Sequence, residues 1–246
     1  MIPKITSIIS TYGAAKFLPT QLDNLLQQTI AAELEIIVVD SGSLENEGEI
    51  VSNYKKRHAN IKYIRTERET LYGAWNHAVA AANGQYLINA NTDDRLGASS
   101  YEVLAATLDT NSEVGLVYSD AWETDDDYDI LNFVDLAPLE NWTLIETPEY
   151  SHKELLLRCF IGAFPMWRRS LHDQFGTFDP TFTVAGDYDF WLRIAEQVPF
   201  KRVAQPLALI LESPDSILCR NKIKHFEEMG ILRRKYFAVV SPPQRQ

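Results

Sequence analysis

The sequence predicts one α/β domain with a mostly parallel central sheet and helices on both faces. Short apolar segments rich in β-branched residues alternate with segments whose apolar residues recur at helical spacing, which is typical of βαβ units. No internal repeat or low-complexity linker divides the 246 residues. A chain of this length buries roughly 70–75% of its unfolded surface, so it can form a core without a metal or a disulfide.

The first half contains the clearest elements. Its strongest strand is EIIVVD, residues 35–40, in which four consecutive β-branched residues end in an acid. Leu18, Leu22, Leu25 and Leu26 recur at helical spacing and predict a helix after the first strand. The other elements expected in this half are strands at 5–10, 61–64, 85–89 and 114–119 and a helix at 72–82.

The second half is less regular. The acidic stretch at 123–129 predicts a long loop. The aromatic segment Phe164-Pro165-Met166-Trp167 is expected to pack in the core, with sugar stacking by Trp167 as the alternative. The remaining expected elements are helices at 153–157, 170–174, 187–195 and 217–236 and a strand at 207–211.

Composition and charge exclude several classes of protein. The chain has 34 acidic and 23 basic residues, a formal charge of -11, which argues against a general nucleic-acid binder. Only Cys159 and Cys219 are present, so neither a disulfide framework nor a cysteine zinc site is expected. The first residues lack a signal-peptide layout, and no apolar stretch approaches the ~20 residues needed to span a bilayer. We therefore expect a cytoplasmic protein.

Polar clusters follow three of the predicted strands. They are Ser10-Thr11-Tyr12, Asp40-Ser41 and Asn91-Thr92-Asp93-Asp94. In open α/β sheets, ligands bind beyond the carboxyl ends of the strands, so this edge is the expected site. For Asp40 alone, a turn or helix-capping role is an equal alternative.

Several common sites lack their motifs. The chain has no G-x-G-x-x-G turn, no Walker glycine loop with Lys and no G-x-S-x-G elbow. A Rossmann dehydrogenase, a P-loop ATPase and a serine hydrolase are therefore disfavoured. Paired carboxylates for glycoside hydrolysis remain open, because acids are plentiful. An acid at a strand end, together with a separate acidic metal site, fits a nucleotide-diphosphate ligand better.

Motifs over about two hundred residues occur in the order found in one known family. They are ITSIISTYGAAKF at 5–17, EIIVVDSGS at 35–43, GAWN at 73–76, GQYL at 84–87 followed by NTDD at 91–94, FGTFD at 175–179, and GDYDFWLR at 186–193. With these segments the chain resembles the family-2 glycosyltransferases, which have the GT-A fold. The resemblance implies a nucleotide-binding half at 1–120, an acceptor and catalytic half at 121–215, and a C-terminal helix and tail at 216–246.

The resemblance also implies a role for each matched residue. Thr11 and Tyr12 would line the nucleobase, and Asp40 would accept its ring N–H. Asp93 would bind Mg²⁺ or Mn²⁺ between the two phosphates, and Asp187 would be the general base. Three further residues, Asn76, Asn91 and Asp94, would complete the donor site.

Each role has a structural alternative. Asp93 and Asp94 would instead form a capping or turn pair before Leu96. Asp187 would be an acid that stabilises the positive end of a helix. Asp189 and Arg193 are four residues apart and are expected to form a structural ion pair.

Three positions depart from the family pattern. Asn91 stands where the first acid of D-x-D is usual, and Gly186 replaces the Glu that precedes the base. Ser213 falls where many members place a metal-binding His, with His152 or Glu212 as candidate replacements. These departures favour, as the alternative function, a non-catalytic module that binds a nucleotide-sugar. A sugar nucleotidyltransferase fits less well, because residues 10–16 lack a basic glycine-rich loop.

The predicted activity is inverting transfer from a UDP-sugar to a hydroxyl of a glycan or another acceptor, assisted by a divalent metal. The resemblance favours single additions, since the Q-x-x-R-W motif and the membrane helices of processive synthases are absent. Basic residues near the C-terminus suggest peripheral contact with the inner face of a membrane, and a solvated helix face is the alternative. These residues are Lys222, Lys224, Arg233, Arg234 and Lys235.

Overall fold

A single mixed sheet organises the molecule in the computed structural model, which describes residues 2–237. The strands are β1 (Ile5–Thr11), β2 (Leu34–Asp40), β3 (Ile61–Arg65), β4 (Tyr86–Asn89), β5 (Arg95–Leu96), β6 (Leu116–Thr124), β7 (Thr143–Ile145), β8 (Met166–Arg168) and β9 (Phe200–Leu211). The helices are α1 (Leu18–Leu26), α2 (Glu47–Lys55), α3 (Leu71–Ala81), α4 (Ser100–Thr110), α5 (Asp127–Leu131), α6 (His152–Leu157), α7 (Leu171–Phe175), α8 (Gly186–Ala195), α9 (Ile217–Arg220) and α10 (Lys222–Phe237), with a 3-10 turn at Ala31–Glu33.

The strand order is β3-β2-β1-β4-β8-β6-β9-β5, with β7 paired to β6. The first four strands are parallel neighbours, as βαβ units require, and β6 pairs with β9 in the same sense. Strand β8 runs antiparallel between β4 and β6 and joins the two halves of the sheet. The predicted α/β domain with a mostly parallel sheet is therefore confirmed.

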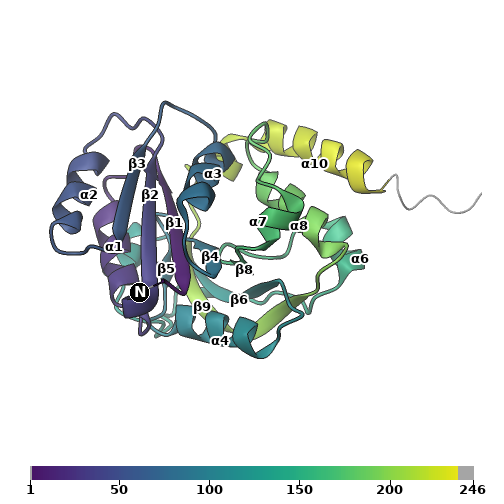
Figure 1. The fold of residues 1–246 in the computed structure, drawn as a ribbon, viewed down its shortest axis with the longest axis horizontal. Helices are drawn as coiled ribbons and strands as arrows, with labels where there is room; N and C mark the ends of the chain where they lie inside the picture. The colour runs from purple at the N-terminus through teal and green to yellow at the C-terminus, as the bar shows by residue number, and fades with distance from the viewer. Residues whose placement is uncertain (1, 238–246) are drawn as a thin grey trace, which may run out of the picture.

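Helices cover both faces of the sheet (Figure 1). On one face, apolar residues of α1, α2 and α4 pack on alternate side chains of the strands, among them Leu22, Val51 and Leu104. On the other face, α3, α7 and α8 contribute Trp75, Leu171 and Trp191 to a second core. The near-continuous burial of β1 and β2 explains their runs of Ile and Val, because a strand covered on both sides has no solvent face.

The structure corrects one expectation in the second half and confirms another. Residues 123–129 are not one long loop, because β6 continues to Thr124 and α5 begins at Asp127, with the side chain of Asp126 accepting the N–H of Tyr128. Trp167 is fully buried against Trp191 and Phe178, so it packs in the core as expected and is not free to stack on a sugar.

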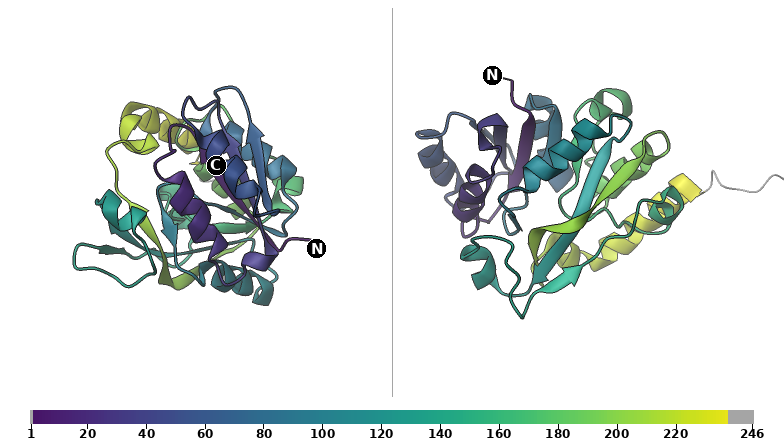
Figure 2. Two further views of the ribbon diagram at one scale, coloured as in Figure 1. Left: turned by 90° about the vertical axis from the view of Figure 1, so that its left-hand side faces the viewer. Right: turned by 90° about the horizontal axis from the view of Figure 1, so that it is seen from below.

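The C-terminal helix α10, yellow in Figures 1 and 2, lies against the part of the molecule that contains α8. Its inner face buries Leu232 and Tyr236 in the second core. Residues 238–246 of the expected tail lie outside the described residues. Among residues 2–237, no helix combines the length and the apolar character that crossing a bilayer needs.

Candidate active site

Three polar clusters meet at one edge of the sheet. Thr11 and Asp40 are the last residues of the neighbouring strands β1 and β2 and stand opposite each other in the parallel register. On the other side of β1, Ala90 donates its N–H to Ile8 just before the segment Asn91–Asp94. Strand pairing therefore brings together side chains that are far apart in the sequence.

Thr11 and Tyr12 differ in their surroundings. Thr11 is buried, and its hydroxyl has no hydrogen-bond partner among residues 2–237. Tyr12 is 45% exposed, and the guanidinium of Arg68 lies 3.4 Å from the centre of its ring. The backbone of residues 66–68 passes close to Gly42. A glycine suits this position because its φ is +68° and an added Cβ would lie 3.0 Å from the backbone nitrogen of Arg68.

Asp40 is fully buried, and its carboxylate is already engaged by the chain. Oδ1 accepts the N–H of Ser43 at 2.7 Å, and Oδ2 accepts from the hydroxyl of Tyr63 and from Arg65. These bonds fix the turn after β2 beside Thr11. A carboxylate has about four acceptor positions, and three are filled here. The predicted contact between Asp40 and a nucleobase would have to share this network.

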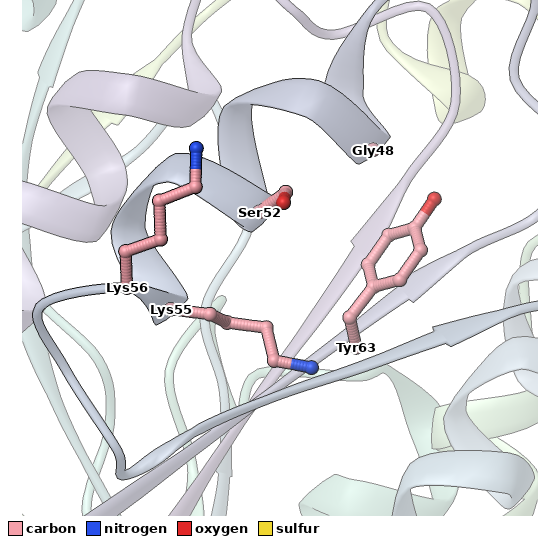
Figure 3. A pocket seen from close by; sticks show the side chains of 5 residues that line it. All are labelled: Gly48, Ser52, Lys55, Lys56 and Tyr63. Carbon is pink, nitrogen blue, oxygen red and sulfur yellow. The ribbon is translucent and has the colours of Figure 1, made fainter.

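Tyr63 also lines a separate hollow of about 450 Å³ between α2 and β3 (Figure 3). Its other lining residues are Gly48, Ser52, Lys55 and Lys56. Within the described residues, the Lys56 amine is paired with Asn53. The hollow contains none of the residues that the motifs single out.

The acidic segment after β4 is held by buried contacts. Asp94 accepts the N–H of Leu211 at 3.0 Å with Oδ1 and the side-chain amide of Asn91 at 2.7 Å with Oδ2. Burial, followed by the charge of Asp93, raises the pKa of Asp94 to about 7. Burial raises the pKa of Asp93 too, with a further contribution from Asp127. The neighbouring Arg95 guanidinium donates to the backbone carbonyls of Thr92 and Asp94 and not to the two carboxylates. Its charge therefore offsets the repulsion between Asp93 and Asp94 only in part.

The uncompensated negative charge is suited to a cation. Within residues 2–237, no cluster of three or more His, Cys, Asp or Glu side chains is arranged to hold a metal ion. Mg²⁺ is commonly bound through one or two carboxylates with substrate phosphates and waters as its other ligands, so Asp93 fits such a site. Asp94 contributes mainly structure, because both its oxygens already accept hydrogen bonds.

Of the other candidate metal ligands, Glu212 is joined to this segment through the residue before it. It follows Leu211, whose N–H binds Asp94, and its own N–H donates to the carbonyl of Thr124. Burial and the charge of Glu212 raise the pKa of Glu123. By contrast, Ser213 accepts the N–H of Asp215, and His152 occupies the first position of α6.

Asp187 lies in the first turn of α8 and has one bound and one free oxygen. Oδ1 accepts the hydroxyl of Tyr72 at 3.0 Å and the N–H of Tyr188 at 2.8 Å. Among the described residues, Oδ2 forms no hydrogen bond with the chain. Burial raises the pKa of Asp187, and the charge of Glu228 raises it further, while the bonds to Tyr188 and Tyr72 lower it. The side chain is therefore oriented through Oδ1 and able to accept a proton at Oδ2.

The space beside Gly186 explains why a glycine precedes this acid. A Cβ at this position would lie 2.6 Å from Cδ2 of the Tyr72 ring. The ring therefore occupies the space into which a longer side chain at 186 would extend. Tyr72 thus accounts for Gly186 and also orients Asp187.

Asn76 joins two parts of the chain. Its amide donates to the carbonyl of Phe178 at 2.9 Å, and its oxygen accepts the N–H of the same residue at 3.0 Å. Its predicted contact with the donor stays a prediction; these two bonds leave one N–H and one acceptor position of the amide for it. The expected pair of Asp189 and Arg193 is confirmed at 2.8 Å.

Sequence reasoning missed three residues at this site: Arg68, Tyr72 and Glu228. Tyr72 stands directly before the GAWN segment, so its helical spacing to Asn76 was an available signal. Arg68 and Glu228 have no motif around them, and only the tertiary fold brings them to the site.

Comparisons with known proteins identify the family and the fold. Residues 6–176 match the family described as "Glycosyl transferase family 2". The chain is 22% identical to the chondroitin synthase of Escherichia coli over 245 residues, which is 98% of this chain and 32% of that protein. It therefore spans about a third of the length of that relative.

Two solved structures share the fold. S. aureus TarS 1–349 in complex with UDP-GlcNAc has a TM-score of 0.69 at 18% identity, over 87% of this chain and 60% of that one. A mannosyltransferase from Pyrobaculum calidifontis in complex with GDP-Man and Mn²⁺ has a TM-score of 0.70 at 19% identity, over 98% of this chain and 71% of that one.

Proposed function

The chain belongs to glycosyl transferase family 2, and we propose that it transfers a sugar from a nucleotide-diphosphate donor to an acceptor hydroxyl with inversion. The observation that carries this proposal is how Asp187 is held: its Oδ1 accepts from two donors, while its Oδ2 has no hydrogen-bond partner among residues 2–237. Its raised pKa makes it a stronger base than an ordinary carboxylate.

The chemical step needs a single base. Oδ2 of Asp187 takes the proton of the acceptor hydroxyl as that oxygen forms a bond to the anomeric carbon. The bond from this carbon to the diphosphate oxygen breaks on the opposite face, and the electron pair leaves with the diphosphate. One displacement inverts the anomeric centre.

The donor site lies at the carboxyl edge of β1, β2 and β4. We propose that Thr11 and Tyr12 contact the nucleobase, since the Thr11 hydroxyl lacks a partner among residues 2–237 and Tyr12 has an exposed ring. Asp40 would take part through the acceptor position that its three bonds leave open. UDP is the proposed nucleotide, supported by the fold shared with TarS, which is solved with UDP-GlcNAc. Asn91 and Asp94 would support this site as neighbours of Asp93.

Asp93 is the residue that would hold Mg²⁺ or Mn²⁺. When bound, such an ion neutralises the diphosphate and stabilises it as a leaving group. Burial, with a smaller contribution from Asp127, raises the pKa of Asp93, and a bound cation would favour the ionised carboxylate against both effects. The fold shared with a mannosyltransferase solved with Mn²⁺ supports this assignment.

The decisive experiment combines calorimetry with turnover. UDP and GDP are titrated into the protein with and without Mn²⁺, and UDP-sugars are then screened for donor hydrolysis and transfer. We expect UDP to bind more tightly than GDP and Mn²⁺ to tighten it further. Asp187→Asn should abolish transfer and keep UDP binding. Turnover that survives this substitution would refute the base, while nucleotide binding without turnover in the wild type would favour a binding module.

We also propose that α10 contacts an anionic lipid surface on the cytoplasmic side. Ile223 and Phe226, on its outer face, are 79% and 76% exposed. They lie three residues apart, so they share a face, and Lys222 and Lys224 flank Ile223. Apolar side chains beside basic ones are the pattern that binds anionic headgroups.

Sedimentation with lipid vesicles tests this contact. The protein should bind vesicles that contain phosphatidylserine and not vesicles of phosphatidylcholine alone. Phe226→Glu should weaken the binding, whereas Val134→Glu, at an exposed position on another segment, should not. Equal binding by the two variants would contradict the proposal.

A further inference from the structure

The inner face of α10 carries a buried carboxylate that holds the approach to α8. Glu228 is 1% exposed. Its Oε1 accepts the N–H of Thr183 at 2.7 Å, and its Oε2 accepts those of Val184 at 2.9 Å and Ala185 at 3.0 Å. Hydrogen bonds to a charged acceptor are about twice as strong as neutral ones, so these three fix the turn firmly.

This turn leads directly into the helix that carries Asp187. Helix α8 begins at Gly186, and Ala185 before it provides no side-chain cap. The N-terminus of a helix leaves backbone N–H groups unpaired and has a positive end, both of which a carboxylate stabilises. Glu228 supplies a carboxylate from a different helix to the N–H of the N-cap residue Ala185 and to those of the two residues before it.

A second set of contacts joins the same two helices. Asp189 is fully buried and accepts from the Lys235 amine at 2.7 Å and the Tyr236 hydroxyl at 3.0 Å. Both donors lie on α10. Helix α10 therefore contacts the chain on both sides of Asp187. Glu228 of α10 binds the turn before α8, and Lys235 and Tyr236 of α10 bind Asp189 within α8.

We propose that Glu228 is a positioning residue for the reaction: it fixes the turn at 183–185 that leads into α8, so that Asp187 directs its Oδ2 at the acceptor hydroxyl. This inference rests on the proposed role of Asp187 as the base. Without Glu228, three N–H groups would lose their acceptor and the turn would rearrange to recover partners.

The charge of Glu228 has a second effect on the same carboxylate. The titratable groups that face Asp187 are Tyr72 from α3, Cys159 from the segment before β8, its neighbour Tyr188, and Glu228 from α10. Of these, Glu228 is the acid that raises the pKa of Asp187. Removing its charge lowers that pKa, so Asp187 would lose its proton at a lower pH and be a weaker base.

The test compares Glu228→Gln and Glu228→Asp with Glu227→Gln, a substitution at the exposed neighbouring residue, in the full chain. Glu228→Gln should bind UDP as the wild type does but lose roughly tenfold to a hundredfold in kcat, as expected for a misplaced catalytic group. The acidic limb of its kcat–pH profile should move to lower pH. Glu228→Asp keeps the charge and shortens the side chain, so kcat should fall while the limb stays in place. Glu227→Gln should match the wild type in both.

The outcomes separate this inference from the proposed function. If Asp187→Asn retains turnover, the base itself is wrong. If Asp187→Asn is inactive while Glu228→Gln and Glu228→Asp keep the wild-type kcat and pH limb, positioning by Glu228 is refuted alone. Urea unfolding and UDP titration of each variant show that it is folded. If Glu228→Gln does not fold, Glu228→Asp tests the proposal alone: a lower kcat supports positioning by Glu228, and a wild-type kcat refutes it.

Discussion

Replacing Asp94 by Asn should change how the stability of the protein depends on pH. Burial, followed by the charge of Asp93, raises the pKa of Asp94 from 3.8 to about 7 in the folded state. The folded protein therefore binds a proton at this carboxyl more tightly than the unfolded chain does. The contribution of Asp94 to the free energy of unfolding consequently falls as the pH rises from about 4 to about 7. At pH 8 the full free-energy cost of keeping this carboxylate ionised in the folded protein is present.

The size of the effect follows from the shift. About three pKa units at 1.36 kcal/mol each give a ceiling of about 4 kcal/mol. Relaxation around the charge reduces this ceiling, so we expect Asp94→Asn to raise the free energy of unfolding by about 2 kcal/mol at pH 8. The new amide oxygen can still accept the Leu211 N–H, and the amide of Asn91 can turn to present its oxygen. At pH 5 the wild-type carboxyl is protonated in the folded protein but largely ionised in the unfolded chain, so part of the cost is already present and the two proteins should differ less than at pH 8.

Urea unfolding at pH 5 and pH 8, with divalent metals removed by a chelator, measures this difference. Glu113→Gln is the matched control, because that side chain is exposed on a loop. Its stability relative to the wild type should be the same at both pH values. If Asp94→Asn also shows no change between pH 5 and pH 8, the reasoning about the buried carboxyl is refuted.

Three further substitutions test other parts of the site. Asp93→Asn should keep metal-free UDP binding but remove the gain in affinity that Mn²⁺ gives the wild type, as measured by calorimetry; an unchanged gain would exclude Asp93 as the metal ligand. Asn76→Ala should cost about 2 kcal/mol of unfolding free energy, because it leaves the N–H and carbonyl of Phe178 without partners. If UDP affinity falls and stability does not, Asn76 binds the donor instead. Gly186→Ala should lower stability by about 1–3 kcal/mol and reduce turnover, since its Cβ would meet the Tyr72 ring; a thermal midpoint equal to that of the wild type would contradict the crowding.

The first half of the chain was largely predictable from local patterns. Strands β1, β2 and β4 are short runs of apolar residues that are buried on both faces, and their pattern depends little on distant partners. Parallel pairing follows from the helices between them. Once these strands are adjacent, their carboxyl ends gather Thr11, Asp40 and Asp93 at one edge.

The second half was less predictable because its elements are short or irregular. Strand β8 has three residues, too few to show a period of two, yet it connects the two halves of the sheet. Strand β9 contains Pro206 and has shifted register against β6, so only its apolar end at 207–211 reads as a strand. Tertiary pairing determines these elements more than local preference does.

Asn91 and Gly186, which depart from the family pattern, are explained by the side chains that lie beside them in the fold. Asn91 donates a hydrogen bond to Asp94, and an ionised acid at 91 would have no hydrogen to donate. A third carboxylate would also add repulsion where burial and Asp93 already raise the pKa of Asp94. At the other position, the Tyr72 ring fills the space beside Gly186 and its hydroxyl binds Asp187. Tyr72 and Asp187 are 115 positions apart in the sequence, so one sequence alone does not reveal this pairing. Placing a Glu at 186 would therefore require a smaller residue at 72, and Asp187 would then lose one of the two donors that orient it.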